Sequence, residues 1–324
     1  MLVLGIETTC DETGAALVLD GRTILTNVVA SSADIHRKYG GVFPEIACRR
    51  HIEAILPVID EAKVEEVDLI AVAKGPGLVG ALLIGTLAAK GLSMAWNKPW
   101  IGVNHVEAHL YASMMGAPDL PFPALGIVLS GGHTLMLRID GLGSYEPIGT
   151  TVDDAIGEAF DKVGVLLGLP YPGGPRVEEL ARRGDPSSFA FSAGRVKRSP
   201  FDFSFSGLKT SVLYAIQGKE LSDQAKADVA ASFQESALRD VVQKASAALR
   251  TFPAKAIFLG GGVCNNRRLK ELFESAFSLP IFWPPPGLSS DNAAMIAGLG
   301  YHKFLEKQRG DPLDLDVETR IPFA

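Results

Sequence analysis

The sequence predicts an α/β fold made of two related lobes. Short apolar runs typical of buried strands alternate with longer helical segments along the 324 residues. Two strands joined by a small polar turn and followed by an Asp-Gly hairpin signal occur twice, at 2–21 and at 124–141. The length corresponds to about two domains. Together these observations predict a duplicated architecture with a covered sheet in each half.

The first half opens with apolar runs that predict three strands, at 2–7, 15–19 and 23–30. A polar turn at 8–13 joins the first two strands. The remaining elements follow from helical spacing or from short apolar runs, and they are a helix at 44–62, a strand at 67–73, a helix rich in small residues at 78–96 and a strand at 100–103.

The second half repeats the opening pattern, with strands at 124–129 and 134–139 around the polar turn Ser130–His133. A polar, poorly periodic stretch at 184–204 predicts a surface loop. The other expected elements are helices near 152–167, 177–183, 208–217, 226–250, 266–276 and 291–307 and strands at 256–259 and 281–283.

Composition excludes several classes of protein. Apolar residues make up 47% and charged residues 21%, which excludes a disordered chain. The three cysteines are far apart, which fits a reducing compartment and excludes a disulfide scaffold. No Lys or Arg precedes Arg22, so a secretory signal is not expected, and the longest charge-free stretch, 120–137, contains too many Pro and Gly to span a bilayer. We therefore expect a cytoplasmic protein without a membrane partner.

The formal net charge of −6 limits the partners that the chain attracts by itself. A protein with this charge has no overall field that would draw in a polyanion. A nucleic-acid partner therefore requires a local basic patch or a helper protein. Arg195, Lys197 and Arg198 precede Phe201, Phe203 and Phe205, a pattern that phosphate contact and base stacking would use, although a solvated loop anchored by Phe residues explains it equally well.

A candidate metal site comes from His105 and His109, which lie four residues apart at the expected start of a helix. Asp291, at the mouth of another helix, is the candidate third ligand. Two histidines and one carboxylate suit Fe²⁺ or Zn²⁺ with positions left open for substrate. Glu107 lies on a different helix face from both histidines, which argues against a zinc protease.

Glycine-rich turns follow several strands and offer backbone N–H groups to a phosphate. The turn at 75–80 matches G-x-G-x-x-G, the pattern of a nicotinamide enzyme. The next strand ends in Asn104-His105 and not in the ribose-binding carboxylate that such an enzyme needs, so close packing of small residues is the preferred interpretation.

Three carboxylates have two open interpretations each. Asp11 lies in the first polar turn, where it would face a phosphate or a metal-bound water, or only close an Asx-turn. Asp161 and Glu178 lie on either side of Gly173-Gly174, where they would bind ribose hydroxyls or simply face solvent.

Taken together, ten segments resemble one family, the TsaD-type tRNA N6-adenosine threonylcarbamoyltransferases, formerly called O-sialoglycoprotein endopeptidases. The segments cover nearly the whole chain in the family's order: 5–13, 38–45, 75–80, 104–109, 129–134, 157–162, 171–174, 204–210, 260–263 and 291–292. Segments 38–45 and 204–210 resemble the bacterial branch. Two departures stand out, Thr9 where Ser is usual and Cys264-Asn265 where smaller residues are usual.

The resemblance implies the fold of actin, Hsp70 and sugar kinases, with a nucleotide cleft between two related lobes. It assigns 1–110 plus 297–324 to the N-terminal lobe and 111–296 to the C-terminal lobe. The implied reaction is transfer of a threonylcarbamoyl group from threonylcarbamoyl-AMP to N6 of the adenosine beside the anticodon, in tRNAs that read codons beginning with A. The product is t6A.

The resemblance also implies the roles of individual residues. His105, His109 and Asp291 would bind one divalent ion, with Fe²⁺ favoured over Zn²⁺. Asp11 and Glu12 would be catalytic and lie at the phosphate end of the cleft. The adenylate, or ATP or ADP in its place, would be bound by Leu129, Ser130, Gly131, Gly132, His133, Asp161, Gly174, Glu178 and Asn266.

Implied partners are the tRNA anticodon loop, a non-catalytic TsaB-like paralogue and a small TsaE-like ATPase. The anticodon loop presents unpaired bases, which fits single-strand recognition. The alternative functions are a non-catalytic nucleotide-binding module of the actin-like fold and, less favoured, a metalloprotease.

Overall fold

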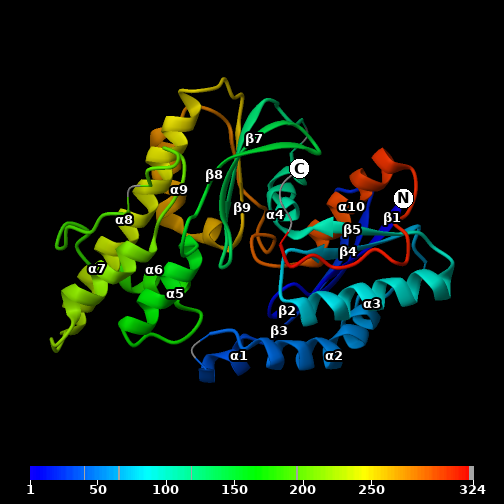
Figure 1. Cartoon of the computed structure of the whole chain (residues 1–324), viewed down its shortest axis with the longest axis horizontal. Helices are drawn as coiled ribbons and strands as arrows, with labels where there is room; N and C mark the ends of the chain where they lie inside the picture. Colours follow the sequence, from blue (N-terminus) through cyan, green and yellow to red (C-terminus); the bar gives the residue numbers. More distant parts are fainter. Residues whose placement is uncertain (40, 65, 118, 195, 321–324) are drawn as a thin grey trace. The chain divides into compact units, whose positions relative to one another are not determined.

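The computed structural model describes residues 1–320 except 40, 65, 118 and 195, and the chain divides into two compact units (Figure 1). Unit 1 comprises Met1–Leu120 and Pro284–Ala324, and unit 2 comprises Pro121–Trp283. The lobe boundaries proposed from the sequence fall inside helices α4 (His105–Met114) and α10 (Ala293–Lys307), which pack on each other within unit 1. Residue 40 of the 38–45 segment and Arg195 of the basic stretch lie outside the described residues.

Unit 1 is built on a five-stranded sheet with the strand order β3-β2-β1-β4-β5. The first three strands pair antiparallel, and β1, β4 and β5 pair parallel. The strands are β1 (Leu2–Glu7), β2 (Glu12–Leu19), β3 (Thr23–Ser31), β4 (Leu69–Gly75) and β5 (Trp100–Asn104). All five predicted strands are therefore confirmed, and β2 begins earlier than predicted because Glu12 and Thr13 already pair with β3.

Helices cover both faces of this sheet (Figure 1). Helices α2 (Pro44–Glu61) and α3 (Val79–Trp96) pack on one face, where Leu4 and Ile6 belong to the buried core. Helix α10 packs on the other face, along β1, β2, β4 and β5. A short helix α1 (Ala33–His36) and a 3₁₀ turn (Arg37–Tyr39) lead from β3 towards α2.

Unit 2 repeats the same topology with the strand order β10-β9-β6-β7-β8, read from the opposite edge. Its strands are β6 (Ala124–Leu129), β7 (Thr134–Gly141), β8 (Ser144–Thr150), β9 (Ile257–Gly260) and β10 (Ile281–Phe282). The antiparallel and parallel pairings also correspond to those of unit 1. The duplication predicted from the two hairpins is therefore confirmed. Sequence patterning missed β8 because, of its seven residues, only Tyr145 and Gly149 are buried.

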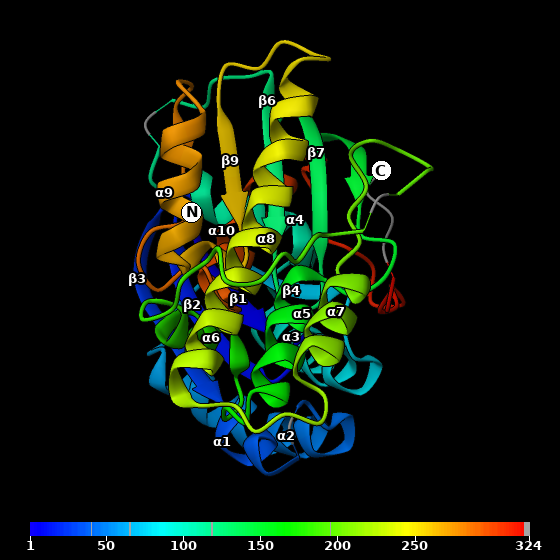
Figure 2. The ribbon, with the colours of Figure 1, turned by 90° about the vertical axis from the view of Figure 1, so that its left-hand side faces the viewer.

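Helices of unit 2 gather over its sheet, with α8 (Asp223–Leu249) crossing in front of β6, β7 and β9 in Figure 2. The others are α5 (Ile156–Leu166), α6 (Gly173–Ala181), α7 (Ser206–Ile216), α9 (Arg267–Ala276) and a 3₁₀ turn η2 (Gly262–Asn265). Two predicted helix starts were wrong. Helix α5 begins four residues late because Thr151 N–H donates to the Thr134 carbonyl and Val152 N–H to the Phe203 carbonyl. Helix α6 begins four residues early because a carboxylate caps its glycines.

The close approach of α10 to β1 depends on residues without bulky side chains. A Cβ atom on Gly5 of β1 would lie 2.1 Å from the backbone oxygen of Ala293, at the start of α10. Gly300 of α10 is equally constrained, since its Cβ would lie 2.4 Å from Cβ of Ala71 in β4. Only hydrogen in place of a side chain allows helix and sheet to approach this closely.

The substitution Gly5→Ala tests this packing. We expect a loss of about 3 kcal/mol in the free energy of unfolding, because a backbone oxygen in a buried helix cannot move as a flexible side chain can. The measurement is urea unfolding monitored by circular dichroism. The matched control is Gly91→Ala in α3, where a Cβ meets nothing within 4 Å, and its helix propensity should add about 0.5–1 kcal/mol. Equal midpoints for the two variants would contradict the packing argument.

Candidate active site

Unit 1 brings together the three residues that the sequence proposed as metal ligands. His109 Nε2 lies 3.0 Å and His105 Nε2 lies 3.6 Å from Asp291 Oδ1. The ligand atoms all lie within 4.8 Å of one another, and the two imidazole rings meet edge to face, with centroids 4.6 Å apart. Both histidines are buried and Asp291 is partly exposed, so the group opens towards solvent on the carboxylate side.

Helix caps fix the positions of these ligands. His105 is the first residue of α4, and the side chain of Asn104 caps that helix by accepting from the N–H groups of Val106 and Glu107. Asp291 directly precedes Asn292, which caps α10 in the same way by accepting from Met295 N–H. Two separate parts of the sequence thus place their ligands at the beginnings of two helices that pack together.

The donor set fits a divalent cation. His109 is fully buried, and its Nε2 faces Asp291 Oδ1 at 3.0 Å without the geometry of a hydrogen bond, an arrangement that a metal bond between the two would complete. Burial alone would lower the pKa of His105, but the negative charges of Glu7 and Asp291 outweigh it and raise the pKa to about 9. The surroundings therefore favour positive charge at this point.

The polar turn after β1 carries Asp11 and Glu12, and its backbone is fixed from outside. Ser32 donates to the Asp11 carbonyl through both its N–H, at 3.0 Å, and its hydroxyl, at 2.7 Å. Leu78 N–H donates to the Thr9 carbonyl. These bonds fix the backbone of the turn through its carbonyl groups and do not use the side-chain carboxylates of Asp11 and Glu12.

Glu12 lies in a strongly negative environment. Burial, followed by the negative charges of Asp291 and Asp11, raises the pKa of Glu12 to about 10. A hydrogen bond with the Asp11 side chain adds to this rise. Glu12 is therefore protonated at neutral pH in the absence of a cation, and a cation held by Asp291 would favour its ionised form.

Sequence reasoning missed His51, which supports the same turn from α2. Its Nδ1 lies 2.8 Å from the Thr13 hydroxyl and its Nε2 lies 3.1 Å from the Cys10 carbonyl. A carbonyl only accepts, so Nε2 carries the proton and the Thr13 hydroxyl donates to Nδ1. Burial lowers the pKa of His51, consistent with a neutral ring. The available signal was the position of a histidine on the apolar face of the predicted helix 44–62.

Sequence reasoning also missed Glu7, the last residue of β1. Its Oε2 lies 2.9 Å from His105 Nδ1, and its Oε1 accepts from Thr9 N–H at 2.6 Å. Thr9, where the family usually has Ser, keeps a hydroxyl 3.2 Å from the same His105 nitrogen. A carboxylate inside a buried strand always needs a partner, and that requirement was the signal in the sequence.

Glu107 of α4 takes part in an ion pair. Its carboxylate lies 2.7 Å from Nζ of Lys303 in α10 and ties the two ligand-bearing helices together. The structure therefore agrees with the argument from helix faces that disfavoured a metalloprotease.

In unit 2, the proposed residue Leu129 ends β6, and Ser130, Gly131, Gly132 and His133 form the turn between β6 and β7. Ser130 N–H donates to the His133 carbonyl at 2.8 Å, and His133 N–H donates to Ser130 Oγ at 3.0 Å. A Cβ on Gly131 or Gly132 would meet nothing within 4 Å. The tip of this turn thus has an accessible backbone of the kind that phosphates approach closely.

Asp161 acts as a helix cap. One oxygen of its carboxylate accepts from Gly173 N–H at 2.7 Å and from Gly174 N–H at 3.1 Å, at the beginning of α6. The proposed substrate residues Asp161 and Gly174 therefore contact each other. The solvent-facing interpretation of Asp161 was wrong, since two backbone groups use its carboxylate.

The remaining proposed residues of unit 2 lie beside a hollow of about 230 Å³. Glu178 lines it and accepts from Arg267 N–H at 3.0 Å, so its solvent-facing interpretation was wrong as well. Asn266 is buried, caps α9 through Leu269 N–H and donates to Gln234 Oε1 at 2.8 Å. The hollow is lined by Glu178, Ala181, Arg182, Pro186, Ala231, Gln234, Glu235, Arg267, Arg268 and Glu271.

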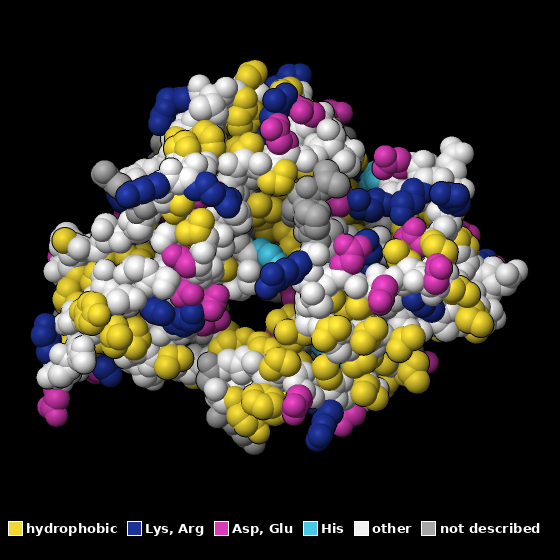
Figure 3. All heavy atoms as spheres, viewed as in Figure 1, with side chains coloured by type: hydrophobic (Ala, Val, Ile, Leu, Met, Phe, Trp, Pro, Cys, Tyr) yellow, Lys and Arg dark blue, Asp and Glu magenta, His cyan; other side chains and the backbone are white. Residues whose placement is uncertain are grey.

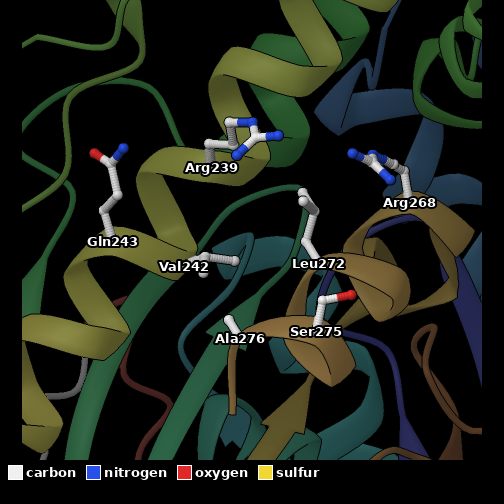
Figure 4. A pocket seen from close by; sticks show the side chains of 7 residues that line it. All are labelled: Arg239, Val242, Gln243, Arg268, Leu272, Ser275 and Ala276. Carbon is white, nitrogen blue, oxygen red and sulfur yellow. The ribbon is translucent and has the colours of Figure 1, made fainter.

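A larger hollow of about 340 Å³ between α8 and α9 contains none of the proposed residues (Figure 4). It is lined by Arg239, Val242, Gln243, Arg268, Leu272, Ser275 and Ala276. Both guanidinium groups are already paired, Arg239 with Glu235 and Arg268 with Glu235 and Glu271. The charge available for an anion there is accordingly small.

The aromatic residues proposed to stack on RNA bases pack in the core or, in the case of Phe201, against it. Phe203 and Phe205 are fully buried, and their rings stack on each other with centroids 5.9 Å apart. Arg198 pairs with Asp202. The anchored-loop interpretation of this stretch therefore holds for its described residues.

The glycines of the 75–80 turn also have a packing role. A Cβ on Gly77 would lie 2.7 Å from the Thr9 carbonyl oxygen, and one on Gly80 would lie 2.3 Å from Cys48 Sγ. Close packing against the polar turn and α2 therefore explains this pattern without a nicotinamide cofactor.

Solved structures similar to this chain share its fold. HypF of T. kodakarensis superposes with a TM-score of 0.63 at 18% identity, covering 95% of this chain and 48% of that one. A ROK family protein from Streptococcus pneumoniae TIGR4 superposes with a TM-score of 0.55 at 14% identity, covering 95% and 99% of the two chains. At these identities the likeness establishes the actin-like fold that the sequence predicted.

Curated relatives are much more similar to this chain in sequence than these solved structures are. A curated tRNA N6-adenosine threonylcarbamoyltransferase from Protochlamydia amoebophila (strain UWE25) is 56% identical over 338 aligned residues, covering all of this chain and 98% of the relative. Another, from Chlamydia trachomatis serovar A, is 49% identical and covers 95% and 94% of the two chains. The family model described as TsaD: tRNA N6-adenosine threonylcarbamoyltransferase matches residues 23–298. The duplicated fold, the His-His-Asp cluster and these matches agree, and the chain belongs to the bacterial TsaD family of tRNA N6-adenosine threonylcarbamoyltransferases.

Proposed function

We propose that the two units contribute different parts of the t6A transfer reaction that this family carries out. Unit 1 supplies the metal ligands and a proton acceptor, and unit 2 supplies the groups that bind threonylcarbamoyl-AMP. The cluster of His105, His109 and Asp291 carries the proposal, because two distant parts of the sequence converge on one set of metal-ligating atoms.

In the proposed reaction, N6 of the target adenosine attacks the carbamoyl carbon of the adenylate. A C–N bond forms, the bond between this carbon and the phosphate oxygen breaks, and AMP leaves with that oxygen. The exocyclic amine is a weak nucleophile and must lose a proton. The protein therefore has to stabilise negative charge on the oxygens and accept that proton.

His105, His109 and Asp291 would hold the divalent ion in unit 1. When bound, such an ion polarises a carbonyl or phosphoryl oxygen and favours developing negative charge. Two neutral imidazoles and one carboxylate leave coordination positions for substrate. We favour Fe²⁺ over Zn²⁺, since this ligand set is typical of non-haem Fe²⁺ sites.

Asp11 is the proposed proton acceptor. It lies in the turn that Ser32 fixes, next to Glu12. Glu12 lies beside Asp11, and the two side chains share a hydrogen bond. We assign Glu12 the supporting role of positioning the Asp11 carboxylate.

Unit 2 is the proposed adenylate-binding part. The accessible backbone of the β6–β7 turn, Leu129 to His133, supports phosphate binding there. The hollow lined by Glu178 and by Gln234, to which Asn266 donates, supports binding of the nucleoside. Asp161 and Gly174, which bond each other at the start of α6, would complete this region, which ATP or ADP would also fit.

tRNA is the substrate, and its anticodon loop is the proposed contact. The net charge of −6 supports a need for helper proteins when the chain binds this polyanion. We propose a non-catalytic TsaB-like paralogue and a small TsaE-like ATPase as these helpers. Their setting would be the cytoplasm, where tRNA is found.

An apolar surface on α2 and α3 is the proposed docking site of the paralogue. Side chains at helical spacing along α3 are 39–70% exposed, and two more on α2 are 64% and 66% exposed. Figure 3 shows hydrophobic side chains gathering on this face of unit 1. Among the described residues, α3 alone is long and apolar enough to cross a membrane. Burial of its exposed apolar side chains by a protein partner would explain this composition without a membrane. This surface consists of Ile52, Leu56, Val79, Leu83, Leu87 and Met94.

The function is tested in cells depleted of this protein. Bulk tRNA should lose t6A, as measured by mass spectrometry of its nucleosides, and wild-type protein should restore it. His105→Ala and Asp291→Ala should fail to restore it because each removes a metal ligand. Glu146→Ala, an exposed carboxylate of β8, should restore t6A as well as wild type does. Unchanged t6A after full depletion would contradict the proposal.

The role of Asp11 is tested by Asp11→Asn, which keeps the shape but removes the proton acceptor. We expect turnover to fall about 10²–10⁴-fold while adenylate affinity changes little. Single-turnover kinetics and equilibrium adenylate binding measure the two quantities. The control is Asp34→Asn, a strongly exposed carboxylate, which should leave both unchanged. Equal losses of turnover and affinity in Asp11→Asn would assign this residue to binding instead.

The docking surface is tested with the purified paralogue from the same organism. We expect Leu87→Glu to weaken binding at least tenfold, because a carboxylate would be buried in an apolar contact. Tyr214→Glu replaces an equally exposed apolar residue on α7 of unit 2 and should bind as wild type does. Affinity is measured by titration calorimetry. Unchanged binding by Leu87→Glu would exclude this surface, and no binding by wild type would exclude the partner.

A further inference from the structure

Glu7 is a buried carboxylate at the end of the central strand β1, and it has no place in the reaction described so far. It is fully buried, so its charge must be compensated by specific partners. Oε1 accepts from Thr9 N–H at 2.6 Å, and Oε2 lies 2.9 Å from His105 Nδ1. One carboxylate therefore bonds both the polar turn and a proposed metal ligand.

The contact determines which nitrogen of His105 carries the proton. An ionised carboxylate only accepts, so Nδ1–H donates to Glu7 whether the ring is charged or neutral. In the neutral form that a metal requires, the lone pair therefore resides on Nε2. Nε2 is the nitrogen that faces Asp291, at 3.6 Å. Glu7 and Asp291 therefore lie on opposite sides of the ring, which rules out Glu7 as a further ligand on the Nε2 side.

The two histidines differ in this respect. His109 Nδ1 has no hydrogen-bond partner among the described residues, so no second side chain determines its tautomer there. The orientation of His105 is determined twice, by Glu7 and by the Thr9 hydroxyl 3.2 Å from the same nitrogen. An oriented ring loses less freedom when it binds a metal, and a carboxylate partner increases its donor strength.

We propose that Glu7 is a positioning residue that prepares His105 for metal binding. The proposal rests on the metal site of the proposed function, and it adds a residue that contacts neither metal nor substrate. It also gives β1 a functional role, since the strand carries at its end the group that orients a ligand on α4.

The experiment measures the affinity of the full-length, metal-free protein for Fe²⁺ under anaerobic conditions, and for Zn²⁺, by competition with a chromogenic chelator. We expect Glu7→Gln to bind either ion about 10–100-fold more weakly than wild type. Glutamine keeps the shape of the side chain but lacks the charge and cannot accept with both terminal atoms.

The matched control is Asp202→Asn. Asp202 is also a buried carboxylate, but it lies in unit 2, where it accepts from Thr150 N–H at 2.9 Å and pairs with Arg198. Its variant should keep the metal affinity within about threefold of wild type, whatever it does to stability. Should Glu7→Gln fail to fold, Thr9→Val takes its place, because it removes only the hydroxyl beside His105 Nδ1 and should also weaken binding.

The outcomes separate this inference from the proposed function. Wild type that binds neither ion would overturn the metal site itself. Wild type that binds an ion, together with a folded Glu7→Gln of equal affinity, would overturn the role of Glu7 and leave the site intact. Equal weakening in Glu7→Gln and Asp202→Asn would also overturn it, because a general loss of packing would then explain both.

Discussion

The contact between α10 and β1 is the constraint on which unit 1 depends. Gly5 and Gly300 let the helix lie against the sheet at distances that any side chain would prevent. Because α10 begins two residues after Asp291, the same contact sets the position of that carboxylate beside α4. Packing and chemistry are thus coupled in one place: moving the helix away from the strand would move a ligand away from two histidines.

Much of the fold could be predicted from sequence, because apolar runs and Asp-Gly turns report directly on buried strands and hairpins. The duplication followed from the two similar openings at 2–21 and 124–141. The edge strand β8 could not be predicted because most of its side chains are not buried and its sequence therefore shows no apolar run. Its pairing with β7 defines it as a strand. Helix starts failed where tertiary bonds decide them, as Asp161 does for α6.

The proposed metal ligands could be predicted from the sequence, but the residues that hold them and the neighbouring turn in place could not. The four-residue spacing of His105 and His109 indicates that they share a helix face, and Asp291 is recognisable by its position before a helix. Glu7 and His51 act through residues distant in sequence, at separations of 98 and of 38 to 41 positions, which no local pattern reveals. The sequence nevertheless contains one indication of each residue: both are titratable side chains on a face of a strand or helix that must be buried.

The carboxylate of Asp161 at the start of α6 has a consequence for anion recognition in unit 2. The first N–H groups of a helix, with the positive end of its dipole, normally offer a phosphate a ready position. Here an internal anion already occupies two of those N–H groups. A second negative group at this helix end would meet repulsion instead of attraction. In the proposed adenylate site, α6 would therefore favour uncharged, hydroxyl-bearing parts of the ligand over its charged part.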